Sequence, residues 1–192
     1  LGRYLKFRPR LVAVFQAQRM PETLQAYGDS DHAGCLKTRR STTGVGVMLG
    51  SHLLKTYSQV QSTISLSSGE SEYYAMLQAS AKGLALRAML EDRGIQLKLQ
   101  VLSDSSAARG LVARRGLGKA RHIQTRYLWL QERVADKDLQ VLTVPTSVNI
   151  ADLFTKSLTE QRTLELLALM NLEFRAGRAD TAKRLIERQA DS

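Results

Sequence analysis

Short apolar runs separated by polar turns dominate the first third of the chain. Residues 24–27 predict a strand, and residues 45–49 and 53–57 predict a hairpin that turns at Gly50. Between them lies a polar loop over residues 30–43, which includes three consecutive hydroxyl side chains. This region therefore predicts three strands, the last two of which pair with each other.

Helical and strand patterns alternate over the rest of the chain. Ser67 and Ser68, followed by an early acid, predict the start of a long helix that ends before Gly94. Further strands are predicted at residues 97–102 and 139–144, and further helices at residues 105–113, 121–135, 148–158, 160–172 and 179–189. Three strands followed by alternating helices and strands indicate a mixed sheet with helices packed on it, an α/β fold.

Four carboxylates stand at the ends of predicted strands or in the first turns of predicted helices. Asp29 follows the first strand, Glu72 lies early in the long helix, and Asp104 and Asp152 follow the two later strands. Strand ends and helix starts of an α/β sheet converge on one edge, where such sheets commonly carry their chemistry. We therefore expect these four acids to form one cluster.

Glu72 is the most informative of the four acids. Its neighbours on the same helix face are small or apolar: Ala75, Met76, Ala79 and Gly83. A carboxylate on a face that packs against a sheet is costly unless a positive charge meets it. The same periodicity also admits Glu70, and an acid in the first helical turn is favoured by the helix dipole without any further role.

The other acids have structural explanations as well. Asp104, between Ser103 and Ser105, is suited to cap the next helix, and Asp152 is suited to a first helical turn. As a set, however, three or four converging carboxylates repel one another strongly unless divalent cations lie between them. Oxygen ligands without a competing histidine pair or thiolate cluster favour Mg²⁺ or Mn²⁺.

The composition favours a polyanionic partner in a reducing compartment. The 192 residues include 28 Lys and Arg against 18 Asp and Glu, a formal charge of +10, which favours nucleic acid over the alternative of a merely solvated basic surface. A single cysteine, Cys35, excludes a disulfide within the chain. No apolar run is long enough to span a bilayer, and no secretory signal core is evident. We expect an intracellular protein, cytoplasmic or nuclear, that is neither secreted nor membrane-bound.

Six segments resemble, in the right order, motifs of ribonuclease H domains from copia-type retrotransposons. They are YGDSDHAGC at 27–35, TRRSTTG at 38–44, SLSSGESEY at 65–73, SDSSA at 103–107, RHIQTRY at 121–127 and VPTSVNIADLFTK at 144–156. Residues 3–6, RYLK, resemble the end of the preceding reverse-transcriptase region. The chain departs from the family pattern at His32, Ser105 and Gln124, where the family has Trp, Asn and Asp.

The resemblance implies a ribonuclease H-like fold, with a five-stranded mixed sheet flanked by helices. It implies that Asp29, Glu72, Asp104 and Asp152 are the catalytic and metal-binding acids, which selects Asp29 over Asp31 and Glu72 over Glu70. The implied activity is two-metal-ion hydrolysis of the RNA strand of RNA–DNA hybrids during reverse transcription, with two Mg²⁺ or Mn²⁺ ions.

The implied organisation has three parts. Residues 1–23 are a connector from the reverse-transcriptase domain of the same polyprotein, which is the expected partner besides the RNA–DNA hybrid. Residues 24–172 are the ribonuclease H-like domain, and residues 173–192 are a charged helical tail. Residue 1 is Leu, which is compatible with an excised piece of a longer protein.

A basic rim is expected to bind the hybrid through its backbone. Its candidate residues are Arg39, Arg40, Arg109, Arg114, Arg115, Lys119, Arg121, His122 and Arg126. Two other functions are compatible with the same sequence. One is a catalytically decayed fragment that only binds nucleic acid, and the other is an integrase- or transposase-like enzyme, whose acid spacing this chain matches poorly.

Overall fold

The computed structural model describes residues 10–114 and 128–177 of the chain. Its main feature is a five-stranded sheet in the order β4-β3-β2-β5-β6. The strands are β2 Thr23–Asp31, β3 Thr42–Leu49, β4 His52–Val60, β5 Lys98–Ser103 and β6 Gln140–Thr143. β2, β3 and β4 pair antiparallel, whereas β5 runs parallel to β2 and β6 runs parallel to β5. The predicted mixed five-stranded sheet is therefore confirmed.

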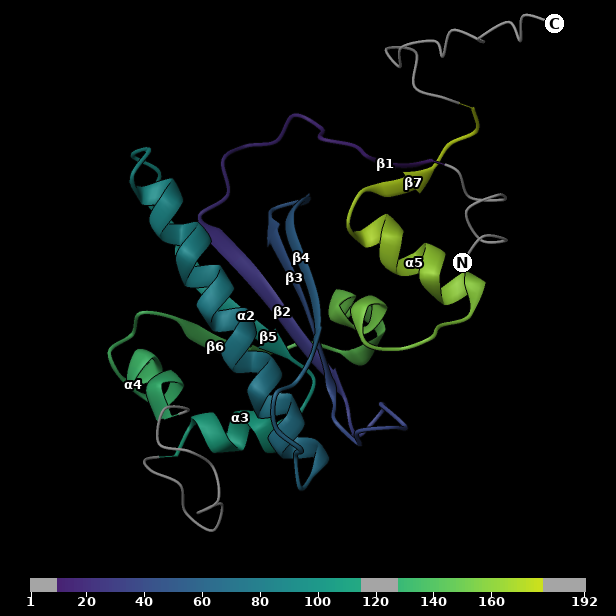
Figure 1. Ribbon diagram of the computed structural model, residues 1–192. Helices are drawn as coiled ribbons and strands as arrows, with labels where there is room; N and C mark the ends of the chain where they lie inside the picture. Colours follow the sequence, from purple (N-terminus) through teal and green to yellow (C-terminus); the bar gives the residue numbers. More distant parts are fainter. Residues whose placement is uncertain (1–9, 115–127, 178–192) are drawn as a thin grey trace, which may run out of the picture.

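Helices cover both faces of this sheet (Figure 1). The long helix α2 (Ser68–Glu91) crosses one face, together with α3 (Ser106–Val112) and α4 (Trp129–Ala135). The other face carries two 3₁₀ turns, η2 (Thr146–Val148) and η3 (Ile150–Phe154), and α5 (Glu160–Leu169). The result is a layered α/β domain, because each apolar face of the sheet is buried under helical elements.

Side chains alternate along β2, so the strand contributes to the apolar clusters on both faces of the sheet. Leu24 and Ala26 are fully buried in the cluster under α2, while Tyr27 packs against the cluster on the opposite face. The strand was predicted to end before Asp29, but it continues to Asp31 and pairs along its whole length with β3. Asp29 is consequently part of the central strand and not of a loop.

Local signals in the sequence account for the position of α2. Ser67 caps the helix by accepting a hydrogen bond from the backbone N–H of Glu70. Glu91 is the last helical residue, and Gly94 follows with a φ of 78°. Gly83 lets the helix approach the sheet, because a Cβ there would lie 2.7 Å from the Leu99 side chain. The predicted long helix is confirmed at both ends.

A second, two-stranded sheet was not predicted. β1 (Leu11–Ala13) pairs antiparallel with β7 (Leu172–Phe174), so part of the expected connector lies beside the segment that follows α5 (Figure 1). The helix predicted over 160–172 accordingly ends at Leu169. The domain boundaries proposed from the sequence stay a prediction.

One other helix prediction needs correction. The helix predicted over 148–158 is replaced by the short 3₁₀ turns η2 and η3. Of the helix predicted over 121–135, the structure describes the part from Leu128 onward, and that part contains α4. The helix predicted over 179–189 lies outside the described residues. Among the helices that the structure describes, none has the length and apolar character needed to cross a bilayer.

Candidate active site

The parallel pairing of β2 with β5 brings the first two acids together. Tyr27 is the register partner of Leu102, so Asp29 and Asp104, each two residues further along, reach the same level of the sheet. Asp29 is 1% exposed within β2, whereas Asp104 follows the end of β5 and is half-buried. The register of β2 and β5 therefore places the buried Asp29 carboxylate beside Asp104, which lies just beyond the C-terminal end of β5.

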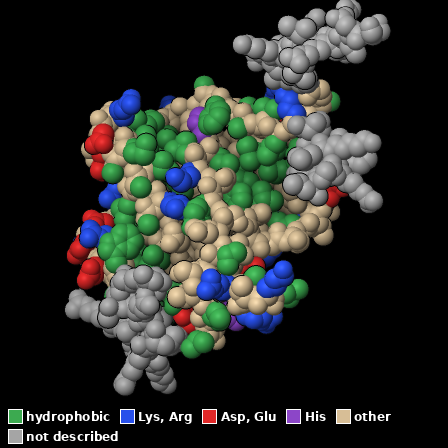
Figure 2. Space-filling model, viewed as in Figure 1, with side chains coloured by type: hydrophobic (Ala, Val, Ile, Leu, Met, Phe, Trp, Pro, Cys, Tyr) green, Lys and Arg blue, Asp and Glu red, His purple; other side chains and the backbone are tan. Residues whose placement is uncertain are grey.

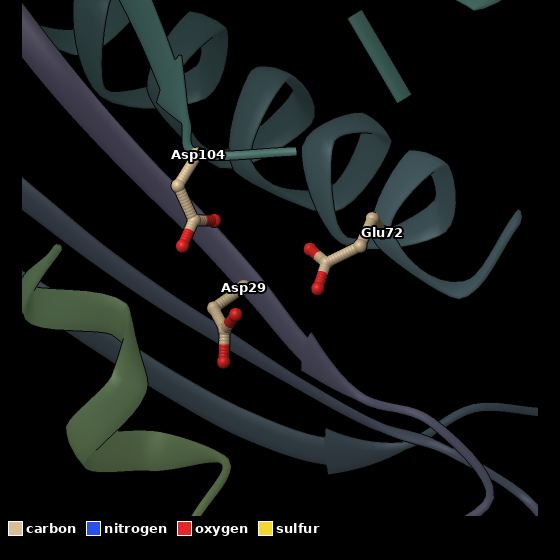
Figure 3. A group of neighbouring side chains, drawn as sticks. All are labelled: Asp29, Glu72 and Asp104. Carbon is tan, nitrogen blue, oxygen red and sulfur yellow. The ribbon is translucent and has the colours of Figure 1, made fainter. Parts of the chain in front are cut away.

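Helix α2 supplies the third acid. Glu72 lies in the first turns of α2, and its side chain reaches toward Asp29 and Asp104 (Figure 3). One carboxylate oxygen of each of the three residues lies within 4.8 Å of the others. The face predicted for Glu72 is confirmed, because Ala75, Met76, Ala79 and Gly83 are buried. We call Asp29, Glu72 and Asp104 the acidic triad.

Asp152 is close to the triad but is not a member of it among the described residues. It is 5% exposed in η3 and meets Asp29 through a shared cation, Lys156. The Lys156 ammonium lies 3.2 Å from the Asp29 carboxylate and 2.8 Å from Asp152 Oδ1. Thr155 Oγ1 also donates a hydrogen bond to Asp29 Oδ2. The four predicted acids thus form a triad with an ion-paired neighbour.

The segment that follows β6 holds Asp104 from the other side. Thr146 Oγ1 donates to Asp104 Oδ2 at 2.7 Å, and Asn149 Nδ2 lies 3.5 Å from Asp104 Oδ1. Asn149 is fully buried, and its Oδ1 accepts a hydrogen bond from the backbone N–H of Ala151 at the start of η3. One residue therefore both caps η3 and faces the triad.

Burial and mutual repulsion make the triad electrostatically strained. Burial raises the pKa of Asp29 to about 6, although the Thr155 hydrogen bond and the Lys156 charge oppose the rise. Burial, and then the charges of Asp29 and Asp104, raise the pKa of Glu72 to about 8. Burial lowers the pKa of Lys156, but its hydrogen bond to Asp152 and the charges of Asp29 and Asp152 outweigh that effect and raise it above its ordinary value.

The donor set fits a divalent cation. Carboxylate oxygens are the ligands that Mg²⁺ and Mn²⁺ prefer, and Glu72 Oε2 is buried without a hydrogen-bond partner among the described residues. A buried, unpaired carboxylate oxygen is costly, and a cation between the three carboxylates would remove that cost. This orphaned oxygen distinguishes the triad from an ordinary solvated acidic patch.

The two acids that competed with the triad in the sequence have structural roles. Glu70 is buried and folds back on the start of α2, where its carboxylate accepts hydrogen bonds from the Leu66 N–H and the Tyr74 hydroxyl. Asp31 Oδ1 accepts a hydrogen bond from the Thr42 N–H at the start of β3. Glu70 therefore stabilises the helix start, and Asp31 closes the β2–β3 loop.

The predicted nucleic-acid contacts are described only in part. Arg39 and Arg40 are exposed on the β2–β3 loop, and Figure 2 shows Lys and Arg side chains gathered at that end of the molecule. Arg114 is exposed after α3, while Arg109 donates hydrogen bonds to the Ser105 carbonyl and to Thr143 Oγ1. The other candidates, Arg115, Lys119, Arg121, His122 and Arg126, lie outside the described residues.

Sequence reasoning missed the residues that surround the acids. It gave no role to Lys156, Thr155, Thr146 or Asn149, although all four contact Asp29, Asp104 or Asp152. The spacing of Asp152 and Lys156, four residues apart, is a recognisable ion-pair signal on a helical segment. The contacts of Thr146 and Asn149 carry no comparable local signal, because they reach across 42 and 45 residues.

The chain has relatives among retrotransposon polyproteins, although no protein-family model matches it. It is 32% identical over 135 residues to the retrovirus-related Pol polyprotein from transposon TNT 1-94 of Nicotiana tabacum. It is 30% identical over 160 residues to the one from transposon RE1 of Arabidopsis thaliana. These matches cover 69% and 82% of the chain. The chain spans only about a tenth of each polyprotein, 10% and 11%.

A solved structure supports the same assignment at the level of the fold. LC11-RNase H1, isolated from compost, matches 70% of this chain and 93% of its own length with a TM-score of 0.50 and 15% sequence identity. At that identity the likeness concerns the fold. The ribonuclease H fold and the Pol polyprotein relatives together identify the chain as a retrotransposon ribonuclease H-like domain.

Proposed function

We propose that the chain is a metal-dependent endoribonuclease that hydrolyses the RNA strand of RNA–DNA hybrids. The observation that carries this proposal is the acidic triad, with its buried and unpartnered Glu72 oxygen, at the edge of a ribonuclease H-like sheet. Its relatives are retrovirus-related Pol polyproteins from transposons, and the sequence resemblance implies hydrolysis of the RNA strand of a hybrid. We thus propose both the substrate, an RNA–DNA hybrid, and the catalytic activity of the triad.

Each acid has a distinct part in holding Mg²⁺ or Mn²⁺. Asp29 is fixed by its strand and by Thr155, so it provides a rigid ligand at the centre. Glu72 and Asp104 complete the group from the helix and from the end of β5. A divalent ion held by these three residues would supply a bound water of lowered pKa and positive charge beside a phosphate. A second ion, implied by the family resemblance, would have to share Asp29 and Asp152 with Lys156.

The remaining residues orient the acids and the substrate. Thr146 and Asn149 orient the Asp104 carboxylate through their contacts with its two oxygens. Arg39, Arg40 and Arg114 are exposed and offer positive charge to phosphates. With the candidates in residues 115–126, they are proposed to contact the hybrid backbone without reading its sequence. We further propose that the reverse-transcriptase domain of the same polyprotein works beside this one inside the cell.

A nuclease assay tests the proposal directly. The chain is incubated with Mg²⁺ or Mn²⁺ and end-labelled RNA–DNA hybrid, RNA duplex or DNA duplex of one sequence. We expect cleavage of the RNA strand of the hybrid alone, and no cleavage with a chelator. Binding of the hybrid without cleavage in either metal would instead indicate a decayed domain that only binds nucleic acid. Cleavage or joining of the DNA duplex would indicate an integrase-like enzyme.

A further inference from the structure

We propose that the Lys156 ammonium takes the place of a second divalent cation, so that the site binds one ion, at Asp29, Glu72 and Asp104. The inference deepens the proposed function and rests on it. It concerns the number of ions and the residue that sets this number. Lys156 is a positioning residue in this view, since it acts through the two carboxylates that it contacts.

The position of the ammonium is the first argument. It lies 3.2 Å from the Asp29 carboxylate and 2.8 Å from Asp152 Oδ1, so it joins an acid of the triad to the acid outside it. Asp29 and Asp152 are also the two acids that a second ion would have to share. The side chain of this protein already places a positive charge between them.

The local backbone builds Lys156 into this position. The N–H groups of Thr155 and Lys156 donate to the Asp152 carbonyl at 3.2 and 3.1 Å, which closes a turn directly after η3. The ammonium therefore returns to the acid four residues earlier through a short loop of chain. The Lys156 side chain is 40% exposed, so its stem is partly covered. Such a pair needs less side-chain ordering than one between distant segments.

The charges on both sides of the ammonium are the second argument. The side chains of Asp29 and Asp152 are 1% and 7% exposed, and buried carboxylates require a cation. An ammonium has three N–H donors and meets this requirement without the dehydration that Mg²⁺ resists. A divalent ion at the same place would face the positive charge of Lys156 at contact distance, so it could enter only after Lys156 had left.

Counting bound ions tests the inference independently of activity. Free Mn²⁺ is measured by electron paramagnetic resonance during titration of the chain. The titration is repeated in the presence of excess hybrid with a 2′-O-methylated RNA strand, which resists hydrolysis. The hybrid is included because a substrate phosphate can itself complete an ion site. We expect one Mn²⁺ per chain in both titrations, and two per chain for Lys156→Met.

Two control variants test whether the number of bound Mn²⁺ ions depends on the positive charge at Lys156. Lys156→Arg keeps a positive charge and should bind one ion, as the unchanged chain does. Lys98→Met removes an exposed lysine at the opposite end of β5 and should leave the count unchanged. Thermal melts with and without Mn²⁺ confirm that each variant is folded. If Lys156→Met does not fold, Lys156→Gln, which also removes the charge, replaces it in the same titration.

The outcomes separate the inference from the proposed function. Two ions on the unchanged chain would overturn the inference, as would one ion on both it and Lys156→Met. One ion on the unchanged chain, without cleavage of any hybrid, would support the ion count and reject the nuclease function. No bound ion at all would reject both.

Discussion

Asp29 on β2 lies directly opposite Gly44 on β3 in the antiparallel register. The absence of a side chain at Gly44 is what lets the segment after β6 approach the sheet at this point. A Cβ there would lie 2.7 Å from the Ala151 carbonyl oxygen and 2.7 Å from Thr155 Cγ2. The same segment carries Thr155 and Lys156, which both contact Asp29. The close packing over Gly44 is therefore a condition for the polar contacts of Asp29.

Gly44→Ala should disturb the site without touching any acid. The added methyl group must displace η3 or β3, and overpacking of this kind costs about 1–3 kcal/mol. Because Thr155 and Lys156 move with η3, we also expect the Mn²⁺ affinity to fall by roughly 10-fold or more. Urea unfolding and a Mn²⁺ titration measure the two effects. Gly110→Ala, in open space on α3, is the control: it should not lower the stability, because alanine favours a helix over glycine, and it should preserve the Mn²⁺ affinity.

Asp104→Asn should separate binding from cleavage. The amide keeps the shape of the side chain but loses the charge that holds a divalent ion, so hybrid cleavage should fall by at least about 100-fold. Hybrid binding should persist or strengthen, because one negative charge near the phosphates is removed. Single-turnover cleavage and a binding titration measure these quantities. Asp92→Asn, at the far end of α2, is the matched control. Full activity of Asp104→Asn would remove Asp104 from the mechanism.

Glu72 should make the metal-free chain less stable as the pH rises. The pKa of its carboxyl is raised from an ordinary 4.5 to about 8 in the fold. Between these values the folded chain holds more protons than the unfolded chain, so the free energy of unfolding falls with increasing pH. Asp29, with its pKa raised to about 6, acts in the same direction at lower pH. We expect a decrease of at least about 1 kcal/mol, after discounting the full shift for partial solvent exposure.

Urea unfolding at about pH 5 and about pH 8.5, in the presence of a chelator, measures this decrease. Glu72→Gln has no charge to accommodate and should show a flatter dependence. Added Mg²⁺ should restore stability at the higher pH, since it favours the ionised carboxylates. A free energy of unfolding that rises between the two pH values in the chelated protein would contradict this account of Glu72.

If the basic rim contacts phosphates, the affinity for the hybrid should depend on the salt concentration through these residues. Replacing Arg114, Arg115 and Lys119 with Ala should weaken hybrid binding and flatten its dependence on salt, by about one unit of slope for each phosphate that is no longer neutralised. Mn²⁺ binding at the triad should not change. Arg39→Ala with Arg40→Ala tests the exposed β2–β3 loop in the same way. If the first set has no effect and the second does, the hybrid lies over that loop.

Sequence patterns predicted the elements whose signals are local. The strand over residues 24–27, the Ser67 cap of α2 and the glycine after its end are all confirmed. Asp29, Glu72 and Asp104 converge as expected from their places at strand ends and on one helix face, although the register that aligns Asp29 with Asp104 is seen only in the structure. Family resemblance was needed to choose Glu72 over Glu70, since both faces of the first turn are buried or partly buried.

Elements that depend on distant partners could not be predicted in this way. β1 has three residues and its partner β7 lies about 160 positions away, so neither is recognisable alone. The run of residues 148–158 is apolar enough to suggest a helix, but Asn149 caps a 3₁₀ turn and Gly44 admits it onto the sheet. The position of Lys156 follows from that same turn.

The pairing of β1 with β7 has a mechanical consequence for a domain whose relatives are polyproteins. The Arg175 N–H donates to the Arg10 carbonyl, so the two ends of the described fold lie side by side. A force that pulls Arg10 and Arg175 apart would break the hydrogen bonds between β1 and β7 one after another, starting from that end. Strands β2 and β5 lie elsewhere, in the five-stranded sheet, and would carry little of that load. Under such a force, the β1–β7 pairing would therefore yield before the strands that hold Asp29 and lead to Asp104.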